Sequence, residues 1–346
     1  IKILNFKWIK EKEILFTENF NVIVWNNWCW KTNILQAISH IFFDDFSWNN
    51  KKNLVYSWEN NLYLEWDFLL KDTQNTIWVS FDLSLNKQNI LLNKKKQTKK
   101  VLFENLLKVC HFLPIDMNLF YLWPKYRRDF LDNILKNSFL EYSKLLSEYE
   151  KVLKNRNKIL KNILEWNSKK DEIYFWNDKF IILSKQILIF RLDLVKFFSE
   201  NIIKNFEIFS WKIDKIEFIY NSKIDLDNIE TSIKDYLEKN FDRDIILWKT
   251  HIWPHIDDFD ILIDDTSIID YASRWEMKSI IICLKLLELS YINEKTWKKT
   301  IFLIDDLSSE LDENHIKFLL DKIANIQTII TSISEINWLK ANYIYL

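Results

Sequence analysis

Residues 21–32 read NVIVWNNWCWKT. The apolar run Val22–Val24 predicts a short buried strand, and the apolar residues after Thr32 recur at helical spacing, so we expect a helix to follow. With glycine at positions 25, 28 and 30, the segment between them would satisfy G-x-x-x-x-G-K-[ST], and this strand–loop–helix context makes the motif specific. The segment therefore predicts an α/β fold with a phosphate-binding loop. The expected helix face consists of Ile34, Leu35, Ile38, Ile41 and Phe42.

The composition supports glycine at these positions. The chain of 346 residues contains 0 Gly and 17 Trp, whereas the usual share of about 7% would give roughly 24 Gly. Ala and Pro, whose codons are GC-rich like those of Gly, are scarce, and Lys, Asn, Ile and Phe, whose codons are AT-rich, are abundant. We infer an AT-rich gene in which UGA codes for glycine and is written here as Trp. The alternative is a genuinely Trp-rich protein without glycine.

Glycine suits the loop because its backbone can adopt positive φ and bring N–H groups close to phosphate oxygens. The helix N-terminus adds partial positive charge. Lys31 would reach the β- and γ-phosphates, and Thr32 would ligate Mg²⁺. Trp would fill the phosphate space, and its left-handed backbone would cost about 1–2 kcal/mol. The predicted nucleotide contacts in this loop are Trp25, Asn26, Asn27, Trp28, Cys29, Trp30, Lys31 and Thr32.

Several other Trp residues also stand where turns are expected. Trp123 and Trp253 each precede a proline, Trp275 follows Ser-Arg, and Trp297 lies in a polar turn before an apolar run. These positions suit glycine better than an indole side chain. Trp176, at the entry to a long amphipathic helix, fits a genuine Trp.

Two adjacent acids follow a second apolar run. Ile301–Ile304 predicts a buried parallel strand with carboxylates at its C-terminal end, where ligands of α/β sheets bind. Asp305 would hold the metal, directly or through water, and Asp306 would orient or deprotonate the attacking water. Alternatively, the two acids cap a following helix. Another buried strand is expected at 327–331.

A third segment suits a phosphate. Residues 273–276 read Ser-Arg-Trp-Glu before a long apolar helix at 280–289. With glycine at position 275 this is S-x-G-E at a helix N-terminus, where backbone N–H groups and the helix dipole favour an anion. Ser273, Trp275 and Glu276 are therefore candidate nucleotide contacts.

Together these segments resemble the RecF family of DNA-repair ATPases, which belongs to the ABC-type group with SMC proteins. The resemblance covers nearly the whole chain and is most specific in two stretches. Trp123–Asp132, WPKYRRDFLD, is similar to G-P-x-x-R-R-x-F-L-D, and Trp253–Asp258, WPHIDD, is similar to G-P-H-x-D-D. The stretch 303–312 resembles the family's L-I-D-D-x-x-S-E-L-D, which implies a nucleotide contact for Asp312. Two departures are Ile115, where many members have Glu, and Glu276, where Gln is commoner.

The resemblance implies an ABC-type P-loop ATPase head, a mixed sheet with flanking helices, and an inserted antiparallel helical arm. The expected segments are 1–115, the N-terminal part of the ATPase lobe; 116–207, the helical arm; and 208–346, the C-terminal part. Two copies would form a homodimer around two ATP molecules with Mg²⁺. Residues 273–278 match the segment that is called the signature of this family. The signature segment of one copy would contact the nucleotide of the other.

The resemblance also implies a cellular role. The family binds gapped, single-stranded or junction DNA, works with RecR and RecO, and indirectly assists RecA loading in the cytoplasm. Hydrolysis is slow and releases the dimer. The alternative function is a nucleotide-gated DNA clamp that does not hydrolyse ATP, or another SMC-like repair ATPase.

The helical arm is also visible in the periodicity of residues 129–206. Two helices of roughly 25 residues would each span about 37 Å, far shorter than the coiled coils of SMC-type proteins. An ordinary two-helix lobe packed on the head is the alternative. One seam follows Tyr142, Leu145, Tyr149, Val152, Ile159 and Ile163, with Arg156 interrupting it, and the other follows Phe180, Leu183, Ile187, Phe190, Leu194 and Phe197.

Other charged residues admit two interpretations. The basic run 94–100 could contact DNA phosphate or be a solvated loop. Arg127 and Arg128 could contact a ligand or form structural ion pairs, and His255 could sense nucleotide or cap a turn.

The remaining composition excludes several classes of protein. The net charge is −1, so the protein as a whole does not attract nucleic acid electrostatically. Any contact with nucleic acid must come from a local basic patch. The three Cys residues lie far apart and predict no disulfide framework, in keeping with a reducing compartment. No apolar run reaches the ~18 residues of a membrane span, and no signal peptide is expected at the start.

Overall fold

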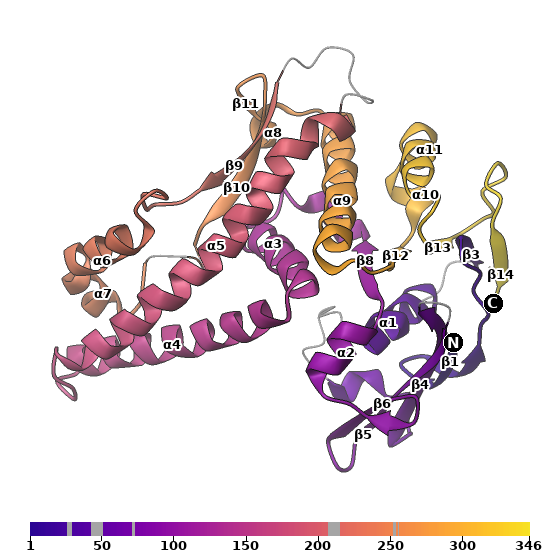
Figure 1. The fold of residues 1–346 in the computed structure, drawn as a ribbon, viewed down its shortest axis with the longest axis horizontal. Coiled ribbons are helices and arrows are strands. Elements are labelled where there is room, and N and C mark those ends of the chain that lie inside the picture. Colours follow the sequence, from indigo (N-terminus) through magenta and orange to yellow (C-terminus); the bar gives the residue numbers. More distant parts are fainter. Residues whose placement is uncertain (26–29, 43–50, 71–72, 207–214, 252–253, 255) are drawn as a thin grey trace. The chain divides into compact units, whose positions relative to one another are not determined.

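The computed structural model describes residues 1–25, 30–42, 51–70, 73–206, 215–251, 254 and 256–346 (Figure 1). The chain forms two compact units. The first combines Ile1–Met117 with Glu288–Leu346, and the second is Asn118–Leu287. The first unit is thus built from both ends of the chain. The division into segments 1–115, 116–207 and 208–346 stays a prediction.

The first unit contains a parallel sheet with the strand order β14-β3-β13-β12-β8. Every residue of β8, β12 and β13 is buried, as expected of parallel strands covered on both faces. The predicted strands at 22–24, 301–304 and 327–331 are confirmed within one or two residues at each end. The strands are β3 (Phe20–Val24), β8 (Lys108–Phe112), β12 (Thr300–Ile304), β13 (Thr328–Ser332) and β14 (Asn342–Tyr345).

A second, antiparallel sheet in this unit has the order β2-β1-β4-β5-β6-β7. Helix α1 (Trp30–Phe42) buries Ile34, Ile38 and Ile41 in one hydrophobic cluster with Leu64 and Val79 of this sheet. The amphipathic pattern after the loop therefore places α1 in the core of the unit. The strands are β1 (Lys2–Phe6), β2 (Ile9–Glu13), β4 (Asn61–Leu70), β5 (Thr73–Asp82), β6 (Lys87–Leu92) and β7 (Lys95–Lys96).

Short helices complete the first unit. Helices α10 (Leu307–Glu310) and α11 (Glu313–Lys322) connect β12 to β13, and α2 (Lys99–Asn105) precedes β8. Two 3₁₀ helices are also present: η1 (Lys51–Leu54) precedes β4, and η2 (Pro114–Asn118) follows β8.

The second unit is mainly helical. Helices α4 (Leu140–Leu164) and α5 (Glu172–Phe206) lie antiparallel (Figure 1). Tyr149 packs on Phe180 with ring centroids 5.5 Å apart, and Tyr142 packs on Phe190 at 5.4 Å. This confirms the predicted helical insertion. Helix α5 has 35 residues, more than the roughly 25 expected, because its buried face extends from Ile173 to Ile202.

A small sheet and further helices accompany the arm. The sheet has the order β11-β10-β9, and α9 begins in this unit and ends in the other. The elements are α3 (Pro124–Ser138), β9 (Ile216–Asn221), α6 (Ile229–Lys239), α7 (Phe241–Leu247), β10 (Asp258–Ile263), β11 (Thr266–Ser267), α8 (Ile268–Tyr271) and α9 (Arg274–Thr296). The predicted fold class, a mixed α/β head with an inserted helical lobe, is confirmed. Across the described ranges, no helix has both the length and the apolar character needed to cross a bilayer.

Among the described residues, four Trp residues adopt the left-handed backbone that glycine favours. Their φ angles are 74° at Trp58, 63° at Trp166, 44° at Trp248 and 55° at Trp297. Their side chains are 101%, 94%, 56% and 91% exposed in the same order. Three of them follow the last residues of α4, α7 and α9, where glycine commonly ends a helix. These positions extend the glycine interpretation to Trp58, Trp166 and Trp248.

Candidate nucleotide-binding site

Three parallel strands bring the predicted site residues of the first unit to one edge of its sheet. Val24 of β3 pairs with Ser332 of β13, and Ile304 of β12 pairs with Ile330 of β13. The C-terminal ends of β3, β13 and β12 therefore lie level with one another. Ligands of open α/β sheets bind at this end of the strands.

Thr32 and Asp305 meet at this edge. The Thr32 hydroxyl donates a hydrogen bond of 2.9 Å to Oδ2 of Asp305. Oδ1 of the same carboxylate accepts a hydrogen bond of 2.7 Å from the Thr331 hydroxyl. Asp305 is only 9% exposed, so both carboxylate oxygens are held by hydroxyl groups in a largely buried position.

Thr331 was not predicted as a site residue. The sequence indicated a buried strand at 327–331 but assigned no function to it. β13 lies between β3 and β12, and this strand order places Thr331 beside the acids. Order within a sheet depends on contacts between distant segments, so the sequence alone offered no local signal for Thr331.

Asp306 immediately precedes α10 and has a left-handed backbone conformation, with φ 52° and ψ 50°. Its backbone N–H donates a 2.9 Å hydrogen bond to the Thr331 hydroxyl. Its side chain makes no capping bond to α10, so the helix-capping alternative is not supported for this acid. Oδ1 of Asp306 is buried and has no hydrogen-bond partner among the described residues.

Lys31 lies at the start of α1, close to the same strand ends. Its amine donates to the Ser332 carbonyl oxygen at 3.3 Å, and the backbone N–H of Trp25 reaches the same oxygen at 3.4 Å. Lys31 is 8% exposed. The predicted contacts Asn26, Asn27, Trp28 and Cys29 lie outside the described residues, and Trp30 is described only as the first residue of α1.

The donors at this edge fit Mg²⁺ and a phosphate. Mg²⁺ prefers octahedral oxygen ligands at 2.0–2.1 Å, so neighbouring ligands are about 2.9 Å apart. The Thr32 and Asp305 oxygens have that separation. The unpaired Oδ1 of Asp306 adds an acceptor that a water molecule could satisfy. Lys31 supplies the positive charge that a phosphate requires.

Asp312 immediately precedes α11 and caps its N-terminus. Its Oδ1 accepts from the backbone N–H groups of Asn314 at 3.1 Å and His315 at 3.2 Å, and its Oδ2 contacts Nδ1 of His315. Burial raises the pKa of the Asp312 carboxyl, but the hydrogen bonds from the His315 side chain and backbone outweigh it and hold the pKa below its usual value. The structure gives Asp312 a capping role, and its nucleotide contact stays a prediction.

The signature segment forms a capping box at the start of α9. The Glu276 carboxylate accepts from the backbone N–H of Ser273 at 2.8 Å and from its hydroxyl at 2.7 Å. The backbone N–H of Glu276 donates back to the Ser273 hydroxyl at 3.3 Å, the reciprocal pattern of this motif. Trp275 between them is 42% exposed. Glu276 thus occupies the donors that were predicted to contact a phosphate.

Arg127 and Arg128 connect two motifs of the second unit. Arg127 forms a bidentate pair with Asp258, with Nε–Oδ1 at 2.6 Å and Nη2–Oδ2 at 2.7 Å. Arg128 donates to the Asp257 carbonyl oxygen at 2.9 Å. The structural ion-pair interpretation therefore describes Arg127. Residues 127–128 and 257–258 are held together by these contacts.

A buried arginine extends this network. Arg191, 2% exposed, donates to both carboxylate oxygens of Asp132 at 3.0 and 2.9 Å. It also donates to the Pro254 carbonyl oxygen at 2.8 Å and to the Tyr220 hydroxyl at 3.3 Å. The Tyr220 hydroxyl in turn donates to Asp257 at 2.9 Å. Arg191 is thus the centre of a charged cluster that the sequence did not indicate.

The Asp257 carboxyl in this cluster has a strongly raised pKa. Burial raises the pKa of the Asp257 carboxyl to about 7, although the hydrogen bond from Tyr220 and the charge of Arg191 act in the opposite direction. The carboxyl therefore titrates near neutral pH.

The other candidate residues stand apart from these contacts. Lys94, Lys95 and Lys96 are exposed, as both interpretations of the basic run allow. Ile115 is 49% exposed. Trp253 and His255 lie outside the described residues.

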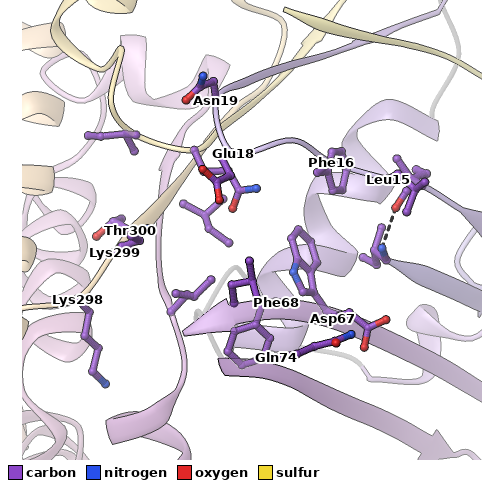
Figure 2. A pocket seen from close by; sticks show the side chains of 18 of the residues that line it. Leu15, Phe16, Glu18, Asn19, Asp67, Phe68, Gln74, Lys298, Lys299 and Thr300 are labelled. Carbon is purple, nitrogen blue, oxygen red and sulfur yellow. Dashed lines mark hydrogen bonds between the residues drawn. The ribbon is translucent and has the colours of Figure 1, made fainter. Parts of the chain in front are cut away.

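A cavity of about 770 Å³ lies elsewhere in the first unit (Figure 2). Phe16, Phe68 and Asp67 line it together with Lys298 and Lys299. None of the residues predicted to bind nucleotide is among its described lining residues. The cavity is therefore separate from the edge formed by β3, β13 and β12.

No protein-family model matches the chain. The chain is 31% identical over 347 aligned residues to the DNA replication and repair protein RecF of Clostridium botulinum (strain Langeland), covering 96% of this chain and 91% of that protein. The protein of the same name from Thermoanaerobacter pseudethanolicus is 28% identical over 339 residues, covering 94% and 91%.

Two solved structures have the same fold. One, the recombination mediator protein RecF-ATPrS in the RecFOR pathway, matches with a TM-score of 0.90 and 26% identity, covering 100% of this chain and 94% of that chain. The other, RecF-ATP in the same pathway, matches with a TM-score of 0.87 and 27% identity, covering 98% and 92%.

Proposed function

The chain belongs to the RecF family, and from this premise we propose that it is a DNA-binding ATPase of recombinational repair and replication-gap processing. ATP and Mg²⁺ bind where β3, β13 and β12 end, and two copies of the chain close around two ATP molecules on DNA. Slow hydrolysis then releases the dimer. The observation that carries the proposal is the contact of Thr32 with Asp305 at 2.9 Å, since it joins the phosphate-loop motif to the acidic strand.

Each residue at this edge has a separate role in the proposal. Lys31 binds the β- and γ-phosphates, Thr32 and Asp305 hold the metal, and Asp306 orients and deprotonates the attacking water. When bound, Mg²⁺ supplies positive charge that offsets the charge on the transferred phosphoryl group. Asp306 suits its role because its buried Oδ1 lacks another partner among the described residues.

Nucleotide binding exchanges hydrogen-bond partners at this site. Lys31 donates to the Ser332 carbonyl, and Thr32 donates to Asp305. A phosphate oxygen would replace the carbonyl as the acceptor for Lys31, and Thr32 and Asp305 would hold the metal. Because Lys31 exchanges one acceptor for another, its buried amine is not left unpaired, which would cost about 1–3 kcal/mol.

The signature segment completes the site in the dimer. In this proposal Ser273, with glycine at position 275, contacts the γ-phosphate held by the partner copy, and Asp312 lies at the same contact. Glu276 holds both donors of Ser273, so its carboxylate must turn away before a phosphate binds there. The negative charge of Glu276 therefore weakens dimerisation relative to Gln.

The cellular role follows from the relatives. The two solved structures belong to proteins described as recombination mediators of the RecFOR pathway. We extend this to the present chain: it binds gapped, single-stranded or junction DNA, acts with RecR and RecO, and indirectly assists RecA loading in the cytoplasm.

The test uses a form of the protein with glycine at the inferred positions, called the glycine form. Asp306→Asn in this form should reduce ATP hydrolysis and prolong the life of the ATP-bound dimer, as measured by phosphate release and by light scattering. Asp321→Asn, at an exposed acid of α11, is the matched control. If Asp306→Asn changes neither the rate of ATP hydrolysis nor the lifetime of the ATP-bound dimer, the result would indicate the non-hydrolysing clamp instead. The glycine form carries Trp→Gly at positions 25, 28, 30, 58, 123, 166, 248, 253, 275 and 297.

DNA binding is tested by its salt dependence. When a protein binds DNA through phosphate contacts, the logarithm of the binding constant falls linearly with the logarithm of the salt concentration. An affinity for gapped DNA that does not change with salt would contradict this part of the proposal.

A further inference from the structure

We propose that Thr331 is a positioning residue that holds two carboxylates in their working orientations: Asp305, the proposed metal ligand, and Asp306, the proposed general base. This inference rests on the ATP site proposed above and deepens it. Thr331 is fully buried and belongs to the strand between the phosphate-loop strand and the acidic strand. It lies one residue beyond the pair Ile304–Ile330, level with Asp305.

The Thr331 hydroxyl uses both of its hydrogen-bonding functions on the two acids. A hydroxyl has one hydrogen to donate and lone pairs to accept. The hydrogen goes to Oδ1 of Asp305 at 2.7 Å, and a lone pair accepts the Asp306 backbone N–H at 2.9 Å. One side-chain atom therefore connects the two adjacent acids.

The contact with Asp305 fixes the orientation of its carboxylate. Thr32 holds Oδ2 and Thr331 holds Oδ1, so the plane of the carboxylate is held from both sides. Of the two hydroxyls, that of Thr32 is the proposed metal ligand. Thr331 is not a proposed metal ligand, so its hydrogen bond to Oδ1 can persist when the metal binds. That hydrogen bond keeps Oδ2 of Asp305 directed toward the metal position.

The contact with Asp306 holds an unfavourable backbone. Asp306 has a φ of 52°, a region that disfavours residues other than glycine. The hydrogen bond from its N–H to Thr331 anchors the peptide that sets this conformation. The conformation in turn decides where the Asp306 carboxylate points. Loss of the Thr331 hydroxyl removes this anchor.

Thr328 provides a matched comparison within the same strand. It is also fully buried, and its hydroxyl donates to the Ile326 carbonyl oxygen at 2.9 Å. It thus has the same chemistry, burial and strand as Thr331 but contacts neither acid. A purely structural role for buried threonine hydroxyls would affect both positions alike.

The experiment compares Thr331→Val, Thr331→Ser and Thr328→Val in the glycine form. ATP binding is titrated against Mg²⁺ and in EDTA, and kcat and KM are measured separately. Thr331→Val should raise the Mg²⁺ concentration for half-maximal ATP binding and lower kcat, each by about tenfold, the effect expected for loss of a hydrogen bond to a charged acceptor. ATP binding in EDTA should stay near that of the unsubstituted protein.

The serine and Thr328 variants complete the test. Thr331→Ser should restore the Mg²⁺ dependence, and Thr328→Val should not alter it. If Thr331→Val does not fold, Thr331→Ala takes its place, because it puts no methyl group against the carboxylate. Equal Mg²⁺ dependence in the Thr331 and Thr328 variants would overturn the inference.

The outcomes for the parent protein separate this inference from the proposed function. If the glycine form binds ATP without hydrolysing it, the proposed ATPase activity is overturned. The Mg²⁺ dependence of ATP binding would still decide the role of Thr331. A glycine form that binds no ATP would overturn both.

Discussion

Thr32 and Asp305 are 273 positions apart in the chain, and their oxygens lie 2.9 Å apart. The pair joins the first turn of α1 to the end of β12. It shows that two short motifs, 273 positions apart in the sequence, meet at one edge of the sheet.

Thr32→Val should weaken Mg²⁺-dependent ATP binding. The substitution keeps the shape of the side chain but removes the proposed metal ligand, so the affinity in Mg²⁺ should fall by about tenfold, or roughly 1.4 kcal/mol. The affinity in EDTA should change much less. Calorimetric titration of the glycine form measures both, with Thr328→Val as the control. An equal loss in Mg²⁺ and in EDTA would show that Thr32 does not act through the metal.

Arg191→Met should destabilise the protein strongly. Removing one partner of a buried ion pair leaves a buried charge unpaired and costs about 3–5 kcal/mol. Here the unpaired group would be the Asp132 carboxylate. Urea unfolding measures the change, and Arg243→Met, at an exposed residue, should change the free energy of unfolding by less than about 0.5 kcal/mol. Similar effects of the two substitutions would contradict the role of Arg191 as the centre of the cluster.

Asp257 should make stability depend on pH. Its pKa is raised from 3.8 to about 7, so the folded protein binds this proton more tightly than the unfolded chain does. The contribution of Asp257 is therefore complete at low pH and is lost as pH rises toward 7, with a slope of at most ~1.4 kcal/mol per pH unit.

Asp257→Asn should remove this slope. Urea unfolding at about pH 5 and about pH 8 should show the unsubstituted protein losing more stability than the variant. Asp242→Asn, at an acid whose side chain is 88% exposed, should keep the original pH dependence. A variant that follows the same curve as the unsubstituted protein would refute the raised pKa.

Trp248→Gly should stabilise the chain as printed. Trp248 has a φ of 44° and ends α7, where glycine avoids a cost of about 1–2 kcal/mol. Trp176→Gly, inside α5, should instead destabilise by about 1 kcal/mol. Thermal unfolding compares the two variants. Peptide fragmentation of the natural protein gives a direct reading, since indole groups at positions 58, 166 and 248 would contradict the glycine interpretation.

The elements of the site were predictable where the signal is local. The apolar run before Asp305 and the run before Trp25 each mark a strand and its C-terminal end within a few residues. Strand order depends on long-range pairing, so Thr331 could not be identified from its own segment. The capping roles of Asp312 and Glu276 also depend on side-chain orientation, which the motifs alone do not specify.

The charged cluster illustrates the same limit. The scarcity of arginine drew attention to Arg127 and Arg128, but the partner Asp258 lies 131 positions away. Arg191 lies within an apolar helical pattern that gave no sign of a buried ion pair. The length of α5 exceeded the expectation because its apolar face continues without a break past Phe197.

The sheet order has a consequence for synthesis on the ribosome. β3 pairs only with β13 and β14 in the described sheet, and these strands begin at residues 328 and 342. At about 5–20 residues per second, the nascent β3 waits roughly 15–60 s for its first neighbour. Its unpaired backbone N–H and C=O groups and its apolar side chains invite pairing with other chains during that interval. The edge that brings Thr32, Asp305 and Thr331 together therefore forms only after β13 has been synthesised.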